Sequence, residues 1–164
     1  MQFGIYEWAY SAGRFEVALR PNKVLYCAEY QAQAKWDIAE ENVLAKVLRV
    51  DFKNFGQYEF VVTSDASAPI QGSVAGVPEK WRTLTFLRPF NETEIAVLGQ
   101  GHGTVWSFQY SHGHFEIEFR TDGYNHFICK DYPAHAHWSI DKDSNLLISW
   151  AQYGMTIFTL LSFY

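Results

Sequence analysis

The stretch YSHGHFEIEFR at residues 110–120 decides the fold, because it repeats YSAGRFEVALR at residues 10–20. Identity is kept, after a shift of 100 positions, at Tyr110, Ser111, Gly113, Phe115, Glu116 and Arg120. Farther along, a shift of 102 positions preserves Cys129, Tyr132, Ala134, Ala136, Trp138 and Ile140. A longer turn around Asp122-Gly123 explains the change in shift. The chain therefore contains a tandem duplication of one unit.

Each copy predicts antiparallel strands, because apolar and polar residues alternate along it. In residues 115–120 the sequence reads FEIEFR, and in residues 15–20 it reads FEVALR. Successive side chains of a strand point to opposite faces, so the apolar set should face a core. Strands are expected near 5–10, 15–20, 24–29, 33–38, 45–52, 57–63, 70–75 and 82–88, and then near 105–110, 115–120, 125–130, 134–140, 145–150 and 155–163.

One short helix is expected between the copies. Asn91 can cap it, Glu94 stands where a capping-box acid belongs, and Gly99 suits its end. We interpret 1–62 as the first copy, 63–100 as extra strands with the connecting helix, and 101–164 as the second copy, all in a single domain 1–164. The predicted fold is all-β, an antiparallel meander that forms a closed or nearly closed barrel. Its last strand, near 155–163, would pair with the first, near 3–8.

Charge and composition exclude several classes of function. The net charge is −5 and no cluster of Lys or Arg offers a basic face, so a nucleic-acid partner is not expected. No apolar run reaches the length of a membrane span, and the first residues do not resemble a signal peptide. A cytoplasmic location is therefore expected. Cys27 and Cys129, at equivalent positions, are expected to be buried thiols.

All six histidines lie between His102 and His137. His135 and His137 share one face of a predicted strand and could bind a metal together. The first copy has Gln33 and Lys35 at these positions, which could not do so. Alternation places the pair on the outer face, and a third ligand is missing from the pattern. We therefore expect surface histidines, with no metal and no cofactor.

No catalytic motif is present. The sequence lacks a G-x-S-x-G nucleophile motif, and the glycine-rich stretch 99–103 lacks the lysine of a phosphate-binding loop. Glu116 and Glu118 fall on the polar side of a strand, where nothing would separate their pKa values. No catalytic residue is predicted, and a non-enzymatic protein is expected.

The pattern Tyr-x-Ala-x-Ala-x-Trp occurs in both copies and has two interpretations. Alanine is a poor strand former, so paired alanines on one face leave room either for large neighbouring rings or for a ligand. Packing is favoured, because bulky inward residues fill a small barrel. On the ligand interpretation, the binding residues would be Tyr30, Ala32, Ala34, Trp36, Tyr132, Ala134, Ala136 and Trp138.

The many antiparallel strands, the short helix and the aromatic inward positions resemble the calycin barrels, which include the lipocalins and fatty-acid-binding proteins. The resemblance implies a barrel around a small apolar ligand, although Gly103-Thr104-Val105-Trp106 is one residue longer than the Gly-x-Trp of lipocalins. Two hypotheses are open. The first is a protein-interaction or structural module of a larger assembly, and the second is an intracellular lipocalin-like carrier. A cavity of several hundred Å³ would favour the carrier.

Overall fold

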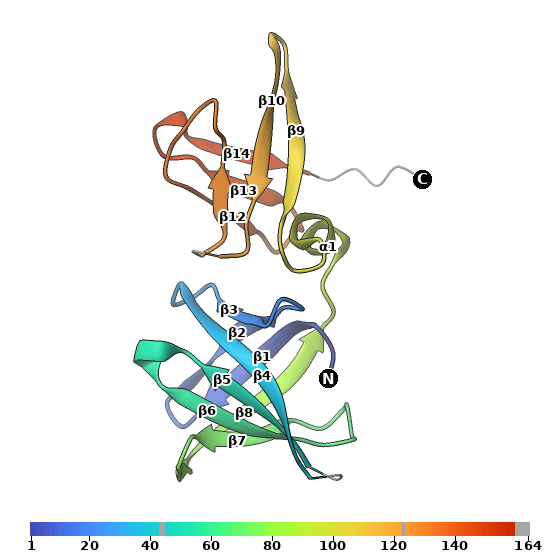
Figure 1. Cartoon of the computed structure of the whole chain (residues 1–164), viewed down its shortest axis with the longest axis vertical. Helices are drawn as coiled ribbons and strands as arrows, with labels where there is room; N and C mark the ends of the chain where they lie inside the picture. The colour runs from blue at the N-terminus through green and yellow to red at the C-terminus, as the bar shows by residue number, and fades with distance from the viewer. Residues whose placement is uncertain (43–44, 123, 160–164) are drawn as a thin grey trace. The chain divides into compact units, whose positions relative to one another are not determined.

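The computed structural model describes residues 1–42, 45–122 and 124–159. The chain divides into two compact units, Met1–Pro89 and Phe90–Tyr164, and each unit holds one copy of the repeat (Figure 1). The predicted all-β class is confirmed, because antiparallel strands form both units and the described residues contain one α-helix. The helix lies between the two copies in the chain, as expected.

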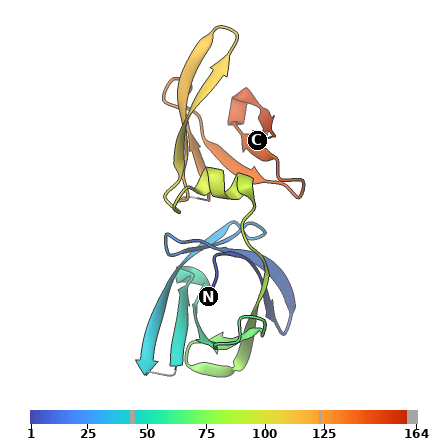
Figure 2. The same ribbon diagram turned by 90° about the vertical axis from the view of Figure 1, so that its right-hand side faces the viewer.

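The first unit is a closed antiparallel barrel of eight strands. They are β1 (Gly4–Tyr10), β2 (Gly13–Leu19), β3 (Val24–Cys27), β4 (Ala32–Asn42), β5 (Ala45–Asp51), β6 (Gln57–Val62), β7 (Ile70–Val74) and β8 (Val77–Arg88). Each strand pairs with the next, and β8 then pairs with β1, placing Trp8 opposite Leu84 (Figure 2). Closure leaves this unit without an edge strand.

Large apolar side chains fill the interior of the first barrel. Trp8, Leu25, Leu48 and Phe60 are almost completely buried there. The ring of Trp8 lies edge-on to the ring of Phe60, at a centroid distance of 5.0 Å. The alternation read from the sequence therefore sends its apolar set inward, as predicted.

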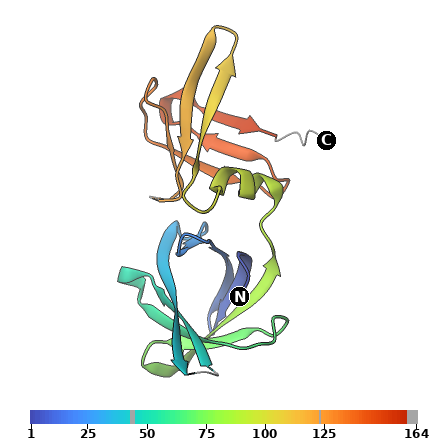
Figure 3. The same cartoon turned by 45° about the vertical axis from the view of Figure 1, so that its right-hand side comes forward.

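The second unit is a six-stranded sheet that curls but does not close. It begins with α1 (Glu92–Leu98) and continues with β9 (Thr104–Tyr110), β10 (Gly113–Phe119), β11 (His126–Ile128), β12 (Ala136–Ile140), β13 (Leu146–Ser149) and β14 (Met155–Phe158). Figure 3 shows the yellow hairpin of β9 and β10 and the red strand β14 toward the two ends of the curved sheet. Val97 and Leu98 of α1 are buried in the core of this unit.

Both predicted caps of α1 are present. The side chain of Asn91 accepts a hydrogen bond from the backbone N–H of Glu94 (2.8 Å), and the backbone N–H of Asn91 donates to the Glu94 carboxylate (2.7 Å). This is the reciprocal capping box expected from the sequence. Gly99, at φ +58°, ends the helix in a conformation that favours glycine.

The duplication is visible in matching hydrogen bonds. Nε1 of Trp36 donates to the carbonyl oxygen of Arg20 (3.0 Å), and Nε1 of Trp138 donates to that of Arg120 (2.7 Å). The backbone N–H of Phe52 donates to Gly56 (3.0 Å), and that of Trp150 donates to Gly154 (2.8 Å). Strands β1 to β6 thus correspond to β9 to β14, while β7 and β8 have no counterpart among the described residues.

A closed barrel is present, as predicted, but the expected pairing of the last strand with the first is not found among the described residues. We expected the last strand to pair with the first, but β14 pairs with β13, and the second neighbour of β1 is β8. The first copy closes with its own extra hairpin, so the two copies do not combine into one barrel. Residues 160–163 of the expected last strand, and Gly123 of the expected turn, lie outside the described residues.

Candidate functional site

The second unit ends on both sides in strands that have only one neighbour. In the first barrel, β6 pairs with β5 and β7, and β1 pairs with β2 and β8. Their counterparts β14 and β9 pair only with β13 and β10 within the part of the chain that is described. Each edge therefore presents a row of backbone N–H and C=O groups that could pair with a further strand.

The inward residues of these edge strands are only partly covered. Tyr6 and Trp8 of β1 are 4% and 2% exposed, whereas their counterparts Trp106 and Phe108 of β9 are half-buried. Phe60 of β6 is fully buried, whereas Phe158, its counterpart on β14, is half-buried. A hollow of about 200 Å³ lies against these rings and the helix residue Val97. In the first barrel, β7 and β8 cover the equivalent apolar surface, and the described residues of the second unit contain no counterpart of these two strands.

The curvature of a closed barrel is nevertheless retained. The rings of Phe108 and Phe158 meet edge-on, at a centroid distance of 5.5 Å and an interplanar angle of 85°. The equivalent rings of Trp8 and Phe60 meet at 5.0 Å and 81°. In the first barrel, two strands lie between β6 and β1, so three spacings of ~4.8 Å, or ~14 Å along the sheet, separate these two strands. The similar ring contact in the second unit is the observation that relates β14 and β9 to this arrangement.

The outer face of β14 differs in chemistry from that of β6. Met155 and Ile157 are 67% and 61% exposed on β14. The first copy has Gln57 and Glu59 at these positions, which the Gly56 and Gly154 hydrogen bonds align. At these two positions, polar residues of the closed barrel are replaced by apolar residues in the second unit. Exposed apolar residues on an unpaired edge mark a surface suited to association.

The residues predicted from the Tyr-x-Ala-x-Ala-x-Trp pattern are divided between the two units. Five are buried within the two separate cores: Ala32, Ala34, Trp36, Ala136 and Trp138. Ala134 is half-buried, and Tyr30 and Tyr132 are exposed. A hydrogen bond with Tyr10 raises the pKa of the Tyr30 hydroxyl, and one with Tyr110 raises the pKa of the Tyr132 hydroxyl. The pattern therefore describes mainly core packing.

A second hollow, of about 330 Å³, lies at one end of the first barrel. Phe15, Tyr30, Ala32, Phe55 and Arg82 are among its lining residues. The Arg82 guanidinium lies 5.2 Å from the ring centre of Tyr10 and 5.3 Å from that of Tyr58. The hollow is thus mainly aromatic, with one cation at its wall.

Both cysteines are free and buried, Cys27 in the first core and Cys129 in the second. Burial raises the pKa of the Cys27 thiol, which disfavours the nucleophilic thiolate. The burial of both cysteines agrees with the expectation that they are small side chains of the core.

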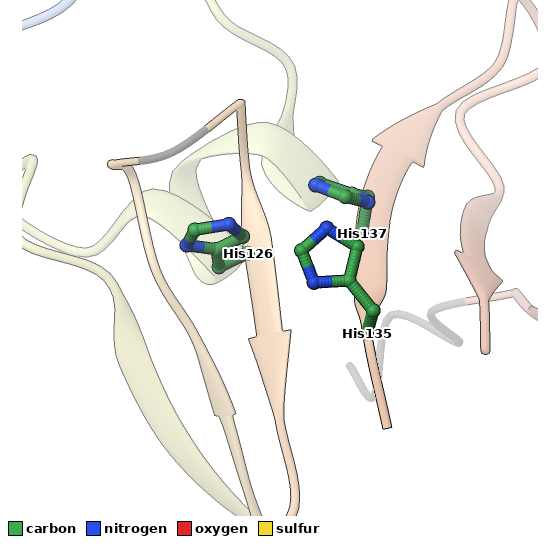
Figure 4. A group of neighbouring side chains, drawn as sticks. All are labelled: His126, His135 and His137. Carbon is green, nitrogen blue, oxygen red and sulfur yellow. The ribbon is translucent and has the colours of Figure 1, made fainter. Parts of the chain in front are cut away.

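The structure adds a histidine to the pair predicted from the sequence. His135 and His137 lie with His126 of β11, and the ligand atoms of all three fall within 4.8 Å of one another (Figure 4). Sequence reasoning missed His126, although the shift of 102 positions aligns it with Val24, whose partner in the hairpin is Lys35. Tracing that pairing into the second copy would have found it.

No protein-family model, curated protein or solved structure matches this chain. Its function therefore has to be inferred from the geometry of the two copies. Within the described residues, no helix combines the length and the apolar character needed to cross a membrane.

Proposed function

We propose that this protein is a non-enzymatic protein-interaction module, a component of a larger assembly, whose second copy takes up a β-hairpin from a protein partner. One observation carries the proposal: among the described residues, the second copy keeps the ring geometry of the first but has no counterpart of β7 and β8, the two strands that close the first barrel. Strand addition at sheet edges is a known mode of peptide recognition, in which the backbone supplies affinity and alternate side chains supply specificity.

The first barrel supplies a template for the hairpin. There, β7 and β8 fill the opening between β6 and β1, with Leu84 buried and Phe86 packed against Tyr6 at a ring distance of 5.2 Å. A partner hairpin would place equivalent apolar residues over Trp106 and Phe108. We therefore infer a partner with an alternating apolar and polar hairpin rather than a helix.

One position of the donated strand should require glycine. Gly72 of β7 stands opposite Phe60, and a Cβ atom there would collide with the Phe60 ring and the carbonyl oxygen of Glu59. Phe158 takes the place of Phe60 in the second copy. A strand that lies beside β14 therefore has to present its smallest residue at this ring.

A synthetic peptide with the sequence of residues 70–88 tests the proposal directly. Added to the full chain, it should bind with a stoichiometry of one. Site-resolved hydrogen exchange should then show new protection of backbone amides in β9 and β14, because both edges acquire partners. Binding without new protection in β9 and β14 would contradict the proposal, as would the absence of binding.

A matched control peptide carries Gly72→Val. It keeps the apolar alternation and the length, so non-specific adhesion to Met155 and Ile157 should persist. Insertion beside Phe158 should be lost, because the new side chain would meet the ring. Equal protection of β14 by both peptides would show that the opening does not select a barrel strand.

A second candidate function is a carrier of a small apolar anion. The hollow at the end of the first barrel favours it, because its volume of about 330 Å³ falls within the ~300–1,000 Å³ typical of ligand pockets. Its aromatic wall suits an alkyl chain, and Arg82 suits a carboxylate.

Quenching of tryptophan fluorescence by dodecanoate, compared with neutral dodecanol, tests the carrier. Trp8 lines the hollow and would report binding. Preference for the anion should disappear in Arg82→Gln, while binding of the alcohol should persist. If neither ligand changes the fluorescence, the carrier hypothesis is wrong.

A further inference from the structure

Three histidines gather on the outer face of the β11–β12 hairpin. His126 stands directly opposite His137 in the strand register, and His135 lies two residues before His137, on the same face. The neighbouring pair in the register, Phe127 and Ala136, is buried in the core, which fixes the histidines on the opposite side. Figure 4 shows the side chain of His126 near the start of β11 and those of His135 and His137 close together on the neighbouring segment.

The spacing of the imidazoles is close to that of a metal site. Their ring centres lie 5.0 to 5.9 Å apart, and their ligand atoms lie within 4.8 Å of one another. Tetrahedral zinc with Zn–N bonds of ~2.05 Å requires nitrogen atoms separated by ~3.4 Å. His135 is exposed and precedes the first ladder residue of β12, so its side chain and backbone can make this adjustment.

A carboxylate stands beside the cluster. An oxygen of Asp122 lies 3.9 Å from Nδ1 of His126, and the guanidinium of Arg120 holds Asp122 through bonds of 3.1 Å and 2.9 Å. A small rotation would let Nδ1–H donate to this carboxylate. Nε2 would then carry the lone pair needed for a metal, as in the carboxylate–histidine–zinc arrangement.

The first copy shows that the fold does not need these histidines. Its β3–β4 hairpin has the same register, with Val24 opposite Lys35, and Gln33 takes the place of His135. Valine, glutamine and lysine cannot form an equivalent metal site. The hairpin therefore does not need the three convergent imidazoles of the second copy in order to form.

We propose that His126, His135 and His137 form a binding site for a divalent metal ion of the zinc class. Neutral imidazole suits Zn²⁺, whereas Mg²⁺ and Ca²⁺ prefer oxygen ligands. Three protein ligands leave the fourth tetrahedral position open to water or to a donor atom from a bound molecule. The ion would link β11 to β12, two strands joined by only two residue pairs in the ladder. This inference does not depend on the proposed hairpin binding.

Titration of the full chain, prepared without a histidine tag, tests the site. We expect calorimetry to give one Zn²⁺ per chain and the melting temperature to rise with Zn²⁺ but not with Mg²⁺ or Ca²⁺, because binding to the folded state alone stabilises it. Bound Co²⁺ should show the intense visible absorption of four-coordinate cobalt, which weak surface binding does not produce.

The first copy supplies the variants. A triple variant introduces the residues of the first copy, which the same hairpin accommodates: His126→Val, His135→Gln and His137→Lys. This variant should lose the one-to-one zinc binding and the cobalt spectrum. His112→Ala with His114→Arg also introduces first-copy residues, at the β9–β10 turn, and should leave both unchanged. Asp122→Asn should keep the stoichiometry and weaken affinity ~10–100-fold.

Three results would overturn the proposal. The first is unchanged zinc binding by the triple variant, and the second is loss of binding in the turn variant. The third is the absence of stoichiometric binding by the unaltered chain. Circular dichroism of each variant separates a lost site from a lost fold.

Discussion

The two copies share six strands, yet within the described residues the first forms a closed barrel and the second an open, curled sheet. They repeat the same hairpins, the same tryptophan hydrogen bonds and the same inward rings, and they diverge after the sixth strand. In the first copy the chain continues into β7 and β8, which return to β1. In the second copy the described strands end at β14. The comparison teaches that one repeat can supply a finished barrel in one place and a strand-accepting surface in another.

The chemistry of the copies changes along with their closure. The edge strand β14 presents apolar Met155 and Ile157 where the closed barrel has glutamine and glutamate. The β11–β12 hairpin carries a histidine cluster where the closed barrel has valine, glutamine and lysine. The first copy therefore serves as an internal control for both features of the second.

Replacing the tryptophan that each copy carries at the equivalent position should have the largest effect on stability. The two replacements also test whether the two cores are equivalent. Trp36→Ala and Trp138→Ala each remove a buried ring and its hydrogen bond to an arginine carbonyl. Each should lower the free energy of unfolding by ~3–5 kcal/mol, as measured by denaturant titration. The exposed Trp81 is the control, and Trp81→Ala should change the free energy of unfolding by no more than ~0.5 kcal/mol. A loss below ~1 kcal/mol in either core would refute their equivalence.

Gly72→Val should make the first copy resemble the second. The new side chain would press against Phe60 and push β7 away from β6, at a cost of ~1–3 kcal/mol. Backbone amides of β1 and β6 should then exchange more rapidly, approaching the rates of β9 and β14. Ser73→Val, at the adjacent position on the other face, is the control. Unchanged exchange in Gly72→Val would show that β7 is not needed to protect the barrel.

Two surface carboxylates, Asp37 in β4 and Asp141 just after β12, should give the smallest effects, and these differ between the copies. Hydrogen bonds from the backbone N–H and the side chain of Asn145 hold the pKa of Asp141 below its ordinary value. Lys23, whose Nζ donates to Asp37 at 2.7 Å, lowers the pKa of Asp37 in the same direction. A depressed folded-state pKa stabilises the protein above the unfolded-state pKa of ~3.9, and the contribution disappears as pH falls through the folded-state pKa.

Melting temperatures of Asp141→Asn and Asp37→Asn, compared with the unaltered chain, measure these contributions. The difference in melting temperature between each variant and the unaltered chain should be present at neutral pH and should vanish in strong acid. High salt at neutral pH should reduce the Asp37 difference, because Asp37 and Lys23 form an exposed ion pair. It should reduce the Asp141 difference less, because uncharged Asn145 is the main cause of that pKa shift and the charge of Lys142 is the smallest. A difference that grows as the pH falls would contradict the assigned direction of the pKa shifts.

Much of the fold follows from local signals. Alternation along 115–120 predicts β10 and its buried face, because the side-chain period of a strand is two and only one face meets a core. Asn91, Glu94 and Gly99 predict both ends of α1, since capping depends on neighbours only a few residues apart. The repeat also predicts that Trp36 and Trp138 occupy equivalent buried positions, as they do.

The closing of the barrel and the gathering of the histidines were decided by the tertiary structure. Local alternation states which face of a strand is apolar, but it does not choose between β8 and β14 as the partner of β1. That choice depends on hydrogen bonds and packing between segments far apart in the chain. His126 likewise joins His135 and His137 only through the register of β11 against β12. The sequence alone determined the duplicated strands, and long-range pairing determined which copy closed and which surface remained open.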